Sequence, residues 1–577
     1  MLGSRGPQRG LFEADNLHAD FVGRNSFYGF LASQRGTLFR DEDFAKLYST
    51  QQGRPSVPPS LLATALVLQT HERVSDEEAK ERADYDLRWK VALGVRVEDR
   101  PFAKSTLQEF RAQLVLHAEQ GAIFQRSLEL AKGQGYFRGK AKLKVALDTT
   151  AILGRGAVKD TYNLLADGIR LVLRALAQPA GVPVEEWARR EGFERYVAEQ
   201  SPKGQAEINW DNPEERRCFL QGVVADADRV LDMVRQARAR SVVGGKEDQG
   251  LVEASGLLSR LLVQDIERRE DGAALHQGVA RDRVVSAHDP EMRHGRKSKA
   301  KRFDGHKAQV TVDTESQIIT AVAVLPGNAP DHDQALAMVE ATETATGCPV
   351  EQTIGDCAYG DGGTRQAFAD AGRQLIAKVP AATNQGLFPK AKFWIDLAAN
   401  TCTCPAGQMS WDQRPHSTGG GVFHFPVAVC EACPLRAQCV RGKGGRTVQV
   451  HPQEALLQKA RAFQASPAFL EYRSLRQAAE HRLARLVQLG IRQARYRGMV
   501  KTLFQLCMAA AVATLTLLAY RAIQIGGNPA VGHLILSFAA LLVLITSWVP
   551  RVKAPAAWRE VCVPNHPRPA AVTHAAP

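Results

Sequence analysis

The stretch that decides the fold is KLKVALDTT, residues 142–150, in which the apolar side chains of Leu143, Val145 and Leu147 alternate with their neighbours. This run of alternating residues ends at Asp148. A period of two predicts a β-strand with one buried face. We therefore expect a strand that delivers the carboxylate of Asp148 to the edge of a sheet.

Further strands are expected downstream of this stretch. KAQVTVD (307–313) and QIITAVAVL (317–325) are separated by a short polar link and predict a hairpin. A helix is expected over about 333–344, then a strand EQTIGD that ends in Asp356, and a last strand RQLIAKVP at 373–380. Three strands, a helix and two more strands predict an α/β core.

Helical segments precede and interrupt this core. Residues 21–120 predict several short helices, with capping boxes at Ser75–Glu78 and at Ser105 with Gln108. Small helical domains of this kind often bind DNA, although a plain helical subdomain fits the pattern equally well. The stretch from 160 to 280 has helical periodicity throughout and predicts a helical insertion.

Composition sets the class of protein. The 577 residues include 74 Lys plus Arg and 61 Asp plus Glu, which gives a net charge of +13. This length predicts several domains, and 45% hydrophobic residues exclude a mostly disordered or collagen-like chain. The first twenty residues contain no apolar signal sequence, so we expect a cytoplasmic protein with reduced cysteines.

The positive excess is concentrated in two stretches. Residues 293–307 contain seven Lys or Arg and one acid, and residues 482–501 contain six and no acid. Such clusters predict contacts with DNA phosphates, although a solvated helix face is the alternative for the second. The candidate DNA-binding residues are Arg296, Lys297, Lys299, Lys301, Arg302, Lys307, Arg482, Arg485, Arg492, Arg495, Arg497 and Lys501. His306 is a further candidate for positioning a DNA strand.

Three acids have the pattern of a two-metal site. Asp148 and Asp356 each follow a predicted strand, and Glu480 lies on a predicted helix four residues after Arg476. Carboxylates are the ligands that Mg²⁺ prefers, and two such ions activate a nucleophile and stabilise a leaving oxygen. Taken singly, a strand-terminal Asp is more often a turn residue, and a helical Glu beside arginines more often a solvated ion pair.

These blocks resemble the DDE transposases of bacterial insertion sequences, in the RNase H-fold superfamily and of the eleven-eighty-two type. The resemblance covers most of the chain. It is carried by GRPSVPPSLL…KVALG (53–94), STLQEFRAQL (105–114), LDTTAILGRGAVKDTYNLL (147–165), KRFDGHKAQV…DHDQA (301–335), DCAYGDGGTRQAF (356–368) and RQAAEHRLAR…KTLFQ (476–505).

The resemblance implies an RNase H-like catalytic core and a transposase. It would bind the double-stranded ends of its element, cleave them, and transfer 3′-hydroxyl ends to target DNA, acting as a homodimer on DNA. Asp148, Asp356 and Glu480 would be catalytic ligands of two Mg²⁺ ions, and Arg476 would lie near DNA phosphates. A catalytically decayed DNA-binding relative and a nuclease without strand transfer are the alternatives.

One motif departs from the wider family. There, Tyr, two residues, Arg, three residues, Glu, six residues and Lys recur in order. Arg476 and Glu480 fit this spacing, but Tyr472 is one residue early and Val487 replaces the Lys. The departure puts hairpin formation at the DNA ends in doubt and leaves the acids unaffected.

The expected organisation is an α/β protein with an RNase H-like core, a helical N-terminal domain and two insertions. The expected boundaries are 15–125 for the DNA-binding helical domain, 140–159 and 281–380 for the core strands, 160–280 for the helical insertion, 381–450 for a Cys-rich insertion, 453–525 for the Glu-bearing helices, and 526–577 for an apolar extension.

Five cysteines crowd into the second insertion. Their C-x-C and C-x₂-C-x₅-C spacing is compatible with a structural Zn²⁺ site, for which His424 could replace one thiol, or with unmetallated core thiols. The candidates are Cys402, Cys404, Cys430, Cys433 and Cys439.

Two uncharged segments follow the last basic stretch. They comprise the nineteen residues between Lys501 and Arg521 and the twenty-nine between Arg521 and Arg551, and the apolar run in the second covers 531–549. By length alone either could span a membrane. Instead, we expect a buried core helix for the first segment and, for the second, a terminal helix packed on the core or on a dimer partner.

Overall fold

The computed structural model describes residues 1–5, 12–49, 53–241, 248–298 and 300–526. It divides into a unit of Met1–Leu518 and a unit of Ala519–Pro577, and every site discussed below lies in the first. The candidate residue Lys299 and the apolar segment 531–549 lie outside the described residues.

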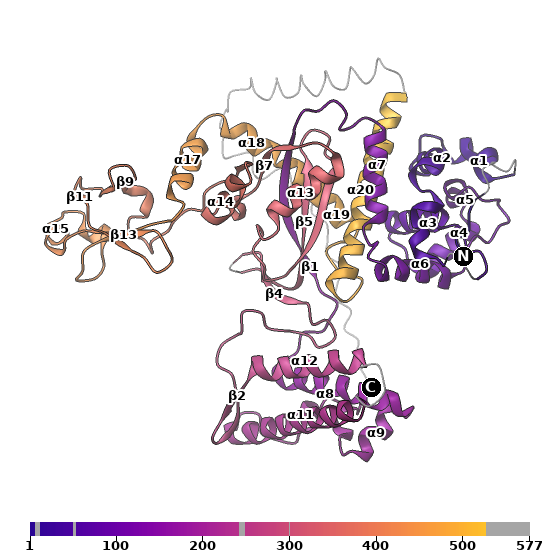
Figure 1. Cartoon of the computed structure of the whole chain (residues 1–577), viewed down its shortest axis with the longest axis horizontal. Helices are drawn as coiled ribbons and strands as arrows, with labels where there is room; N and C mark the ends of the chain where they lie inside the picture. Colours follow the sequence, from indigo (N-terminus) through magenta and orange to yellow (C-terminus); the bar gives the residue numbers. More distant parts are fainter. Residues whose placement is uncertain (6–11, 50–52, 242–247, 299, 527–577) are drawn as a thin grey trace, which may run out of the picture. The chain divides into compact units, whose positions relative to one another are not determined.

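A six-stranded mixed sheet carries the candidate site (Figure 1). Its order is β4-β5-β1-β7-β8, and β6 also pairs with β5. β5 is antiparallel to β1, β4 and β6, whereas β1, β7 and β8 run parallel. The strands are β1 (Leu143–Leu153), β4 (Arg293–Arg296), β5 (Arg302–Asp313), β6 (Ile319–Pro326), β7 (Val350–Ile354) and β8 (Gln374–Ile376).

Helices cover this sheet. Every residue of β5 from Ala308 to Asp313 is buried, as expected for a strand covered on both faces. Both α13 and α19 contact it. The helices and short 3₁₀ turns of this region are α13 (Ala335–Thr346), η4 (Cys357–Tyr359), α14 (Gly362–Asp370), α17 (Glu454–Ala465), α18 (Phe469–Leu475), α19 (Gln477–Gln488) and α20 (Met499–Gly526).

The structure confirms the expected hairpin and corrects the expected end of the first strand. β5 and β6 pair antiparallel, with Val310 opposite Val322. β1 does not end at Asp148 but continues to Leu153, because β5 pairs with it as far as Gly305. β7 leaves β1 earlier, at Ala146. Asp148 therefore lies within a strand, just beyond the point where one of its two neighbours stops.

The N-terminal part of the chain is helical. Its elements are α1 (Ala14–Val22), α2 (Phe27–Leu38), η1 (Asp41–Leu47), α3 (Pro59–Glu72), α4 (Asp76–Tyr85), α5 (Leu87–Leu93), α6 (Lys104–Leu116) and α7 (Ala122–Gly133). The capping box at the start of α4 is confirmed, since Ser75 and Glu78 bond reciprocally. The second predicted box is wrong: α6 begins at Lys104 after Ala103, so Ser105 is inside the helix.

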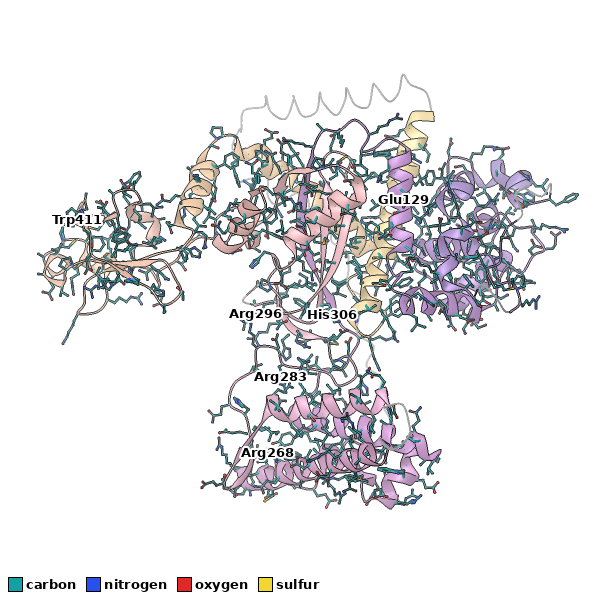
Figure 2. All side chains as sticks on the ribbon, viewed as in Figure 1. Glu129, Arg268, Arg283, Arg296, His306 and Trp411 are labelled. Atoms are coloured by element: carbon teal, nitrogen blue, oxygen red, sulfur yellow. The ribbon has the colours of Figure 1, made fainter. Side chains whose placement is uncertain are left out.

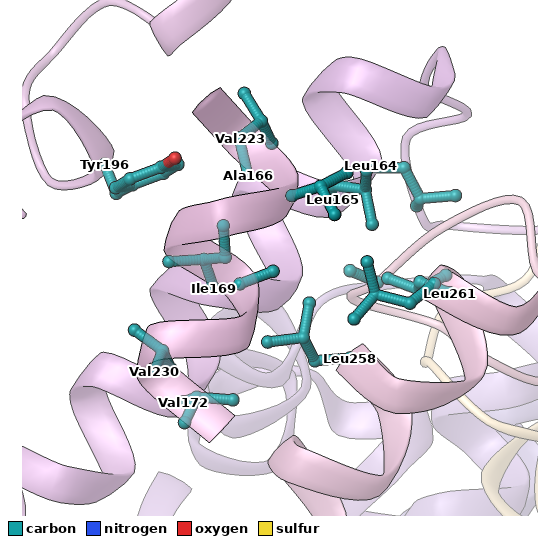
Figure 3. Packing of buried hydrophobic residues seen from close by; sticks show 14 of the residues in the cluster. Leu164, Leu165, Ala166, Ile169, Val172, Tyr196, Val223, Val230, Leu258 and Leu261 are labelled. Carbon is teal, nitrogen blue, oxygen red and sulfur yellow. The ribbon is translucent and has the colours of Figure 1, made fainter. Parts of the chain in front are cut away.

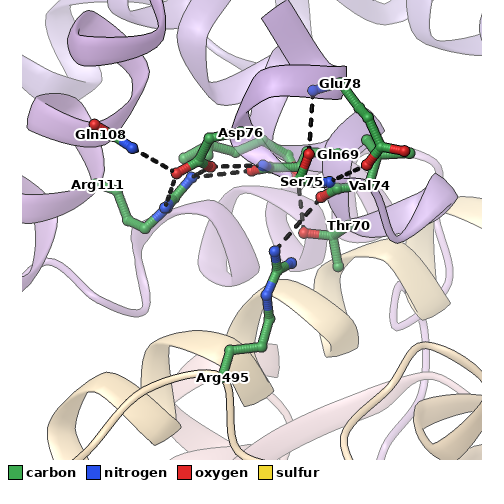
Figure 4. A network of polar contacts seen from close by, with 10 residues as sticks. Gln69, Thr70, Val74, Ser75, Asp76, Glu78, Gln108, Arg111 and Arg495 are labelled. Atoms are coloured by element: carbon green, nitrogen blue, oxygen red, sulfur yellow. Dashed lines mark hydrogen bonds and ion pairs between the residues drawn. The ribbon is translucent and has the colours of Figure 1, made fainter. Parts of the chain in front are cut away.

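A polar network holds α3, α4 and α6 together (Figure 4). Asp76 accepts hydrogen bonds from Gln69 at 2.8 Å, Gln108 at 3.0 Å and Arg111 at 2.6 Å. Burial on its own raises the pKa of Asp76, but these hydrogen bonds outweigh it and hold the pKa well below its usual value. Arg495, from the segment after α19, donates to the carbonyl of Val74 at 3.5 Å.

The segment after β1 forms a module with its own core (Figure 3). Ile169, Val223 and Leu258 come from three different helices and are almost fully buried against one another. A separate core of this kind is what an independent insertion requires. Its elements are α8 (Thr161–Ala177), η2 (Gln178–Ala180), α9 (Val184–Arg190), η3 (Glu194–Tyr196), α10 (Pro202–Gln205), α11 (Pro213–Ser241), α12 (Gln249–Asp265), β2 (Ile266–Arg269) and β3 (Gly272–Leu275).

The cysteine-rich segment folds into two small three-stranded sheets, β11-β10-β9 and β12-β13-β14. We call residues 381–450 the Cys-rich module. Its elements are η5 (Lys390–Lys392), β9 (Trp394–Asp396), β10 (Thr401–Thr403), β11 (Met409–Ser410), β12 (Gln413–Pro415), β13 (Gly421–His424), α15 (Val427–Glu431), α16 (Arg436–Cys439) and β14 (Thr447–Val450).

The first uncharged segment lies within α20. Residues Met499–Gln524 are the one helix in the described ranges that is long and apolar enough to cross a membrane, with a mean hydropathy of 1.9. However, 83% of its most apolar window is buried inside the structure. Burial of this degree is typical of a core helix, which is the role expected for this segment.

Candidate active site

Two of the three predicted acids come from the neighbouring parallel strands β1 and β7, at the level where β7 ends. Ala146 of β1 is paired with Ile354 of β7, and Asp148 and Asp356 each come two residues later. Because the two strands run in the same direction from this pair, both acids lie at the same level of the sheet, just beyond the last residue of β7. Each carboxylate is held by a backbone N–H, that of Thr149 at 2.7 Å and that of Ala358 at 2.8 Å.

The third acid reaches this edge from α19, which packs on β1 and β5. Glu480 forms an ion pair with Arg476, one turn earlier on the chain. The guanidinium of Arg476 also lies 3.5 Å from the carboxylate of Asp148. Arg476 thus links the first and third acids, although 328 residues separate it from Asp148.

All three acids line one open cavity of about 610 Å³. A fourth carboxylate and five cationic side chains share its wall. The charged lining residues are Asp148, Asp331, Asp356, Glu480, Arg296, Lys297, Lys307, Arg476 and Arg492. Carboxylates that suit metal cations therefore alternate with cations that suit phosphate oxygens.

The electrostatics of Asp148 reflect this crowding. Burial raises the pKa of its carboxyl, and the carboxylates of Asp356 and Glu480 add to this rise, whereas the Thr149 N–H and the charge of Arg476 oppose it. The net result is a pKa of about 6, against an ordinary value of 3.8. Like charges that converge in this way favour either a proton or a bound cation.

Asp331 was not among the residues predicted from the sequence. Its carboxylate accepts a hydrogen bond from Lys307 at 2.6 Å, and Lys307 also donates to the carbonyl of Ala329 at 2.6 Å. Gln309, two residues along β5, donates to the Asp331 carbonyl at 2.9 Å and to the Tyr359 hydroxyl at 3.3 Å. The loop after β6 is thereby tied both to β5 and to the turn that follows Asp356.

The structure brings some of the predicted basic residues to the cavity and not others. Arg492 lines it and donates to Thr150 at 3.1 Å. By contrast, Arg482 donates to Gln317 at 3.1 Å, and Arg495 contacts Val74. Residues 489–498 follow the end of α19 at Gln488, so the second basic stretch does not form a single helix face.

The remaining basic candidates lie elsewhere in the described chain. Lys301 and Arg302 are exposed near the β4–β5 turn, and Arg485 and Arg497 lie outside the cavity lining. Lys501 borders a different groove, beside α6. Figure 2 labels Arg296 on β4 and His306 on β5. His306 is fully buried on β5, so it presents no surface to a DNA strand.

The carboxylates of Asp148, Asp356 and Glu480 have the chemistry of divalent-metal ligands, but their present positions do not form a metal site. Hard carboxylate oxygens and the raised pKa of Asp148 favour a cation. Within the described residues, however, no group of three or more His, Cys, Asp or Glu is placed to hold a metal ion. The Arg476 guanidinium lies against two of the three acids, so it would have to move away before the three acids could hold a common metal ion.

The cysteines do not support the zinc expectation, since no three of them are placed to hold a metal ion within the part of the chain that the structure describes. Cys402 is fully buried among Phe393, Phe423 and other apolar side chains. Burial raises the pKa of its thiol to about 11, which keeps it neutral. The other four border a small cavity of about 30 Å³ and are free thiols: Cys404, Cys430, Cys433 and Cys439. Core thiols, the alternative, fit this arrangement.

Comparison with known families gives two matches. The family model described as "Transposase DDE domain" matches residues 403–519, which include Glu480. A second, described as "Transposase domain (DUF772)", matches residues 20–113, from α1 to α6. Asp148 and Asp356 lie outside both matched segments. No curated protein and no solved structure matches the chain. Together, the two family matches support a DDE transposase, an enzyme that cuts and transfers DNA.

Proposed function

We propose that this protein is the transposase of an insertion sequence. It binds the element's ends, cleaves the DNA and transfers the freed 3′-hydroxyls to target DNA by two-metal phosphoryl transfer. The observation that carries this proposal is the single cavity lined by Asp148, Asp356 and Glu480 together with five cationic side chains. That combination suits a phosphodiester held beside metal cations.

Asp148, Asp356 and Glu480 would hold two Mg²⁺ ions. When bound, the ions supply Lewis acidity for the scissile phosphate and lower the pKa of an attacking water or 3′-hydroxyl. Asp148 comes from β1, and its carboxyl feels the charges of both Asp356 and Glu480, so it would hold the cations together with them. Its raised pKa means that the carboxyl must lose a proton before it binds a cation well.

The cations of the cavity would act on the DNA. Lys307 is held by Ala329 and Asp331 and keeps one ammonium N–H for a phosphate oxygen. Arg492 is fixed by Thr150 on β1. Arg476 forms ion pairs with Asp148 and Glu480, and its guanidinium would be free to bind a phosphate if cations took its place beside these acids.

The finer assignments belong to the same proposal. The order β6-β5-β1-β7-β8, in which β5 is antiparallel to β1 and β6 while β7 and β8 run parallel to β1, supports an RNase H-like core, and β4 is an additional strand on β5. We infer that the segment matched at 20–113 binds the element ends, that the enzyme acts as a homodimer on paired ends, and that it works in the cytoplasm at the nucleoid. The eleven-eighty-two type is part of this proposal.

The test is an assay with labelled element-end duplexes, a target plasmid and Mg²⁺. A transposase yields end cleavage and also products in which the labelled 3′ end is joined to the plasmid. Cleavage without joined products would contradict transposition and indicate a nuclease. Binding without cleavage would indicate a catalytically decayed relative. Omitting Mg²⁺ is the control, and both reactions should then stop.

A further inference from the structure

The β11-β10-β9 sheet of the Cys-rich module has one open face with large apolar side chains. Trp394, Thr403 and Met409 stand opposite one another across the three strands. Trp394 is 73% exposed and Met409 45% exposed. Trp411 comes two residues after Met409, one residue beyond the end of β11, where exposed and buried residues still alternate, and it is 68% exposed. Figure 2 labels Trp411 on this module. We call Trp394, Met409 and Trp411 the tryptophan face.

The opposite side of the same sheet is buried. Ile395, Cys402 and Ser410 form the next row and are at most 8% exposed. The hydroxyl of Ser410 donates to the carbonyl of His424 at 2.6 Å, which ties this sheet to β13. The tryptophan face is therefore the outer side of a packed sheet. Single exposed apolar residues are ordinary, but two indoles and a thioether grouped on one face indicate a binding surface.

The charge of the module indicates what the surface binds. Residues 381–450 contain seven Lys or Arg and three Asp or Glu. Lys392 is exposed two residues before Trp394, and Lys443 is also exposed. Neither forms an ion pair among the residues that the structure describes. A second copy of this module would have the same positive charge and be repelled, whereas a polyanion would be attracted.

Exposed flat aromatic groups on a positively charged module are the chemistry that binds unpaired nucleobases. Each base offers a π-face to an indole, and the phosphates on either side meet the cations. Stacking of this kind does not depend on sequence, because every base has such a face. A paired duplex shields those faces within its own stack, so it would gain much less.

We propose that the tryptophan face binds unpaired bases of a DNA strand by stacking on Trp394 and Trp411. This proposal rests on the proposed function for the identity of the nucleic acid. The module lies in the chain between Asp356 and Glu480, so a strand frayed at the element end is the occupant that the enzyme would meet. The face would hold that strand apart from its complement.

The test compares the full-length chain with a Trp394→Ala/Trp411→Ala variant. Binding is measured by fluorescence anisotropy with a labelled single-stranded oligonucleotide and with the matching duplex. Loss of one stacked base, about 1 to 3 kcal/mol, corresponds to a roughly 5-fold to 150-fold loss in single-strand affinity. Duplex affinity should change by less than about twofold.

Two further variants keep the result interpretable. Val427→Ala removes another exposed apolar side chain of the same module, 45% exposed, and should leave single-strand affinity unchanged. Trp394→Phe/Trp411→Phe retains aromatic rings and should recover most of the affinity, which a misfolded module would not. Unchanged single-strand affinity in the double Ala variant would overturn the proposal. The proposal would also be overturned if the double Ala variant differed from the unmodified chain only in its sedimentation, because the tryptophan face would then be a contact between two copies of the chain.

The outcome is independent of catalysis. Asp148→Asn should bind the single strand as the unmodified chain does, because the tryptophan face contains no catalytic acid. If the chain fails to cleave DNA yet loses strand affinity with the two tryptophans, the proposed function is wrong and this binding surface stands. If the chain cleaves DNA normally and the two tryptophan substitutions do not affect strand affinity, the binding surface is wrong and the proposed function stands.

Discussion

Asp148 carries a charge that its surroundings oppose. Its carboxyl has a pKa of about 6 when folded and an ordinary value of 3.8 when exposed. The free energy penalty is therefore absent below pH 3.8, grows between these values and is complete above pH 6. At about 1.4 kcal/mol for each pH unit, the difference destabilises the metal-free fold by up to about 3 kcal/mol.

We predict that Asp148→Asn stabilises the metal-free protein at pH 8, because it removes the opposed charge. The thermal midpoint of the variant should exceed that of the unmodified chain at pH 8, and the two should converge near pH 4. Calorimetry in EDTA at both pH values measures this. Equal midpoints at pH 8 would contradict the electrostatic account of the site.

Lys307 and Asp331 should act as one unit. Lys307→Ala removes a cation from the cavity and should slow cleavage roughly 10-fold to 100-fold, while end binding falls much less. Asp331→Asn should slow cleavage less, because Lys307 keeps its bond to Ala329. If Asp331 works by positioning Lys307, the double variant is no slower than Lys307→Ala. Additive losses in single-turnover assays would show that Asp331 acts separately.

The contrast between these residues shows what the sequence reveals about a site. Asp148 and Asp356 follow alternating apolar runs, so the pattern predicts that strands deliver them. Asp331 lies in a loop without such a pattern, and Lys307, its partner, is 24 residues earlier. Only the pairing of β5 with β6 brings the two together. The contact of Arg476 with Asp148 likewise depends on how α19 packs, which local sequence does not specify.

At the scale of elements, two serines that both have cap spacing in the sequence should differ in how much they contribute to the free energy of unfolding. Ser75 accepts from the N–H of Glu78 and caps α4, so Ser75→Ala should cost about 1 kcal/mol of unfolding free energy. Ser105 is exposed inside α6 and should cost close to nothing when changed to Ala. Denaturant unfolding of the two variants measures this. Equal losses would contradict the assigned start of α6.

Element boundaries were predictable where local chemistry sets them. The hairpin of β5 and β6 follows from two alternating runs joined by a short polar link, and the structure confirms it. The start of α6 was missed because Ser and Gln at cap spacing also occur within helices. The end of β1 was missed because pairing with β5, and not the residues of β1, decides how far the strand extends.

At the scale of the whole molecule, charge should govern affinity for DNA. Arg296 and Lys297 are exposed at the cavity, so changing both to Ala should lower the slope of log affinity against log salt by roughly 2. Arg268 is the control, since it lies on the helical insertion and pairs with Asp228 at 2.6 Å (Figure 2). Titrations of end duplexes at several salt concentrations measure the slope. An unchanged slope in the Arg296/Lys297 variant would place the phosphate contacts elsewhere.

The net charge of +13 could not by itself identify these contacts. The first basic stretch supplies three cations to the cavity, Arg296, Lys297 and Lys307, whereas the second supplies only Arg492. The other basic residues of the second stretch lie on different elements: some are on α19, which ends at Gln488, and the others lie in the segment after it or on α20. The two basic stretches can be recognised in the sequence, but which of their residues line the cavity depends on the fold.

The central claim is that three acids from distant parts of the chain form one catalytic site. Mg²⁺-dependent cleavage of a labelled element-end duplex tests it most directly, with Asp148→Asn, Asp356→Asn and Glu480→Gln compared separately. Glu351→Gln is the control, since Glu351 is an exposed acid on β7, 3.7 Å from Lys142. Each of the three should lower the cleavage rate by about 10³-fold or more with end binding retained, and the control should not. Cleavage within about tenfold of the unmodified rate in any of the three would contradict the account.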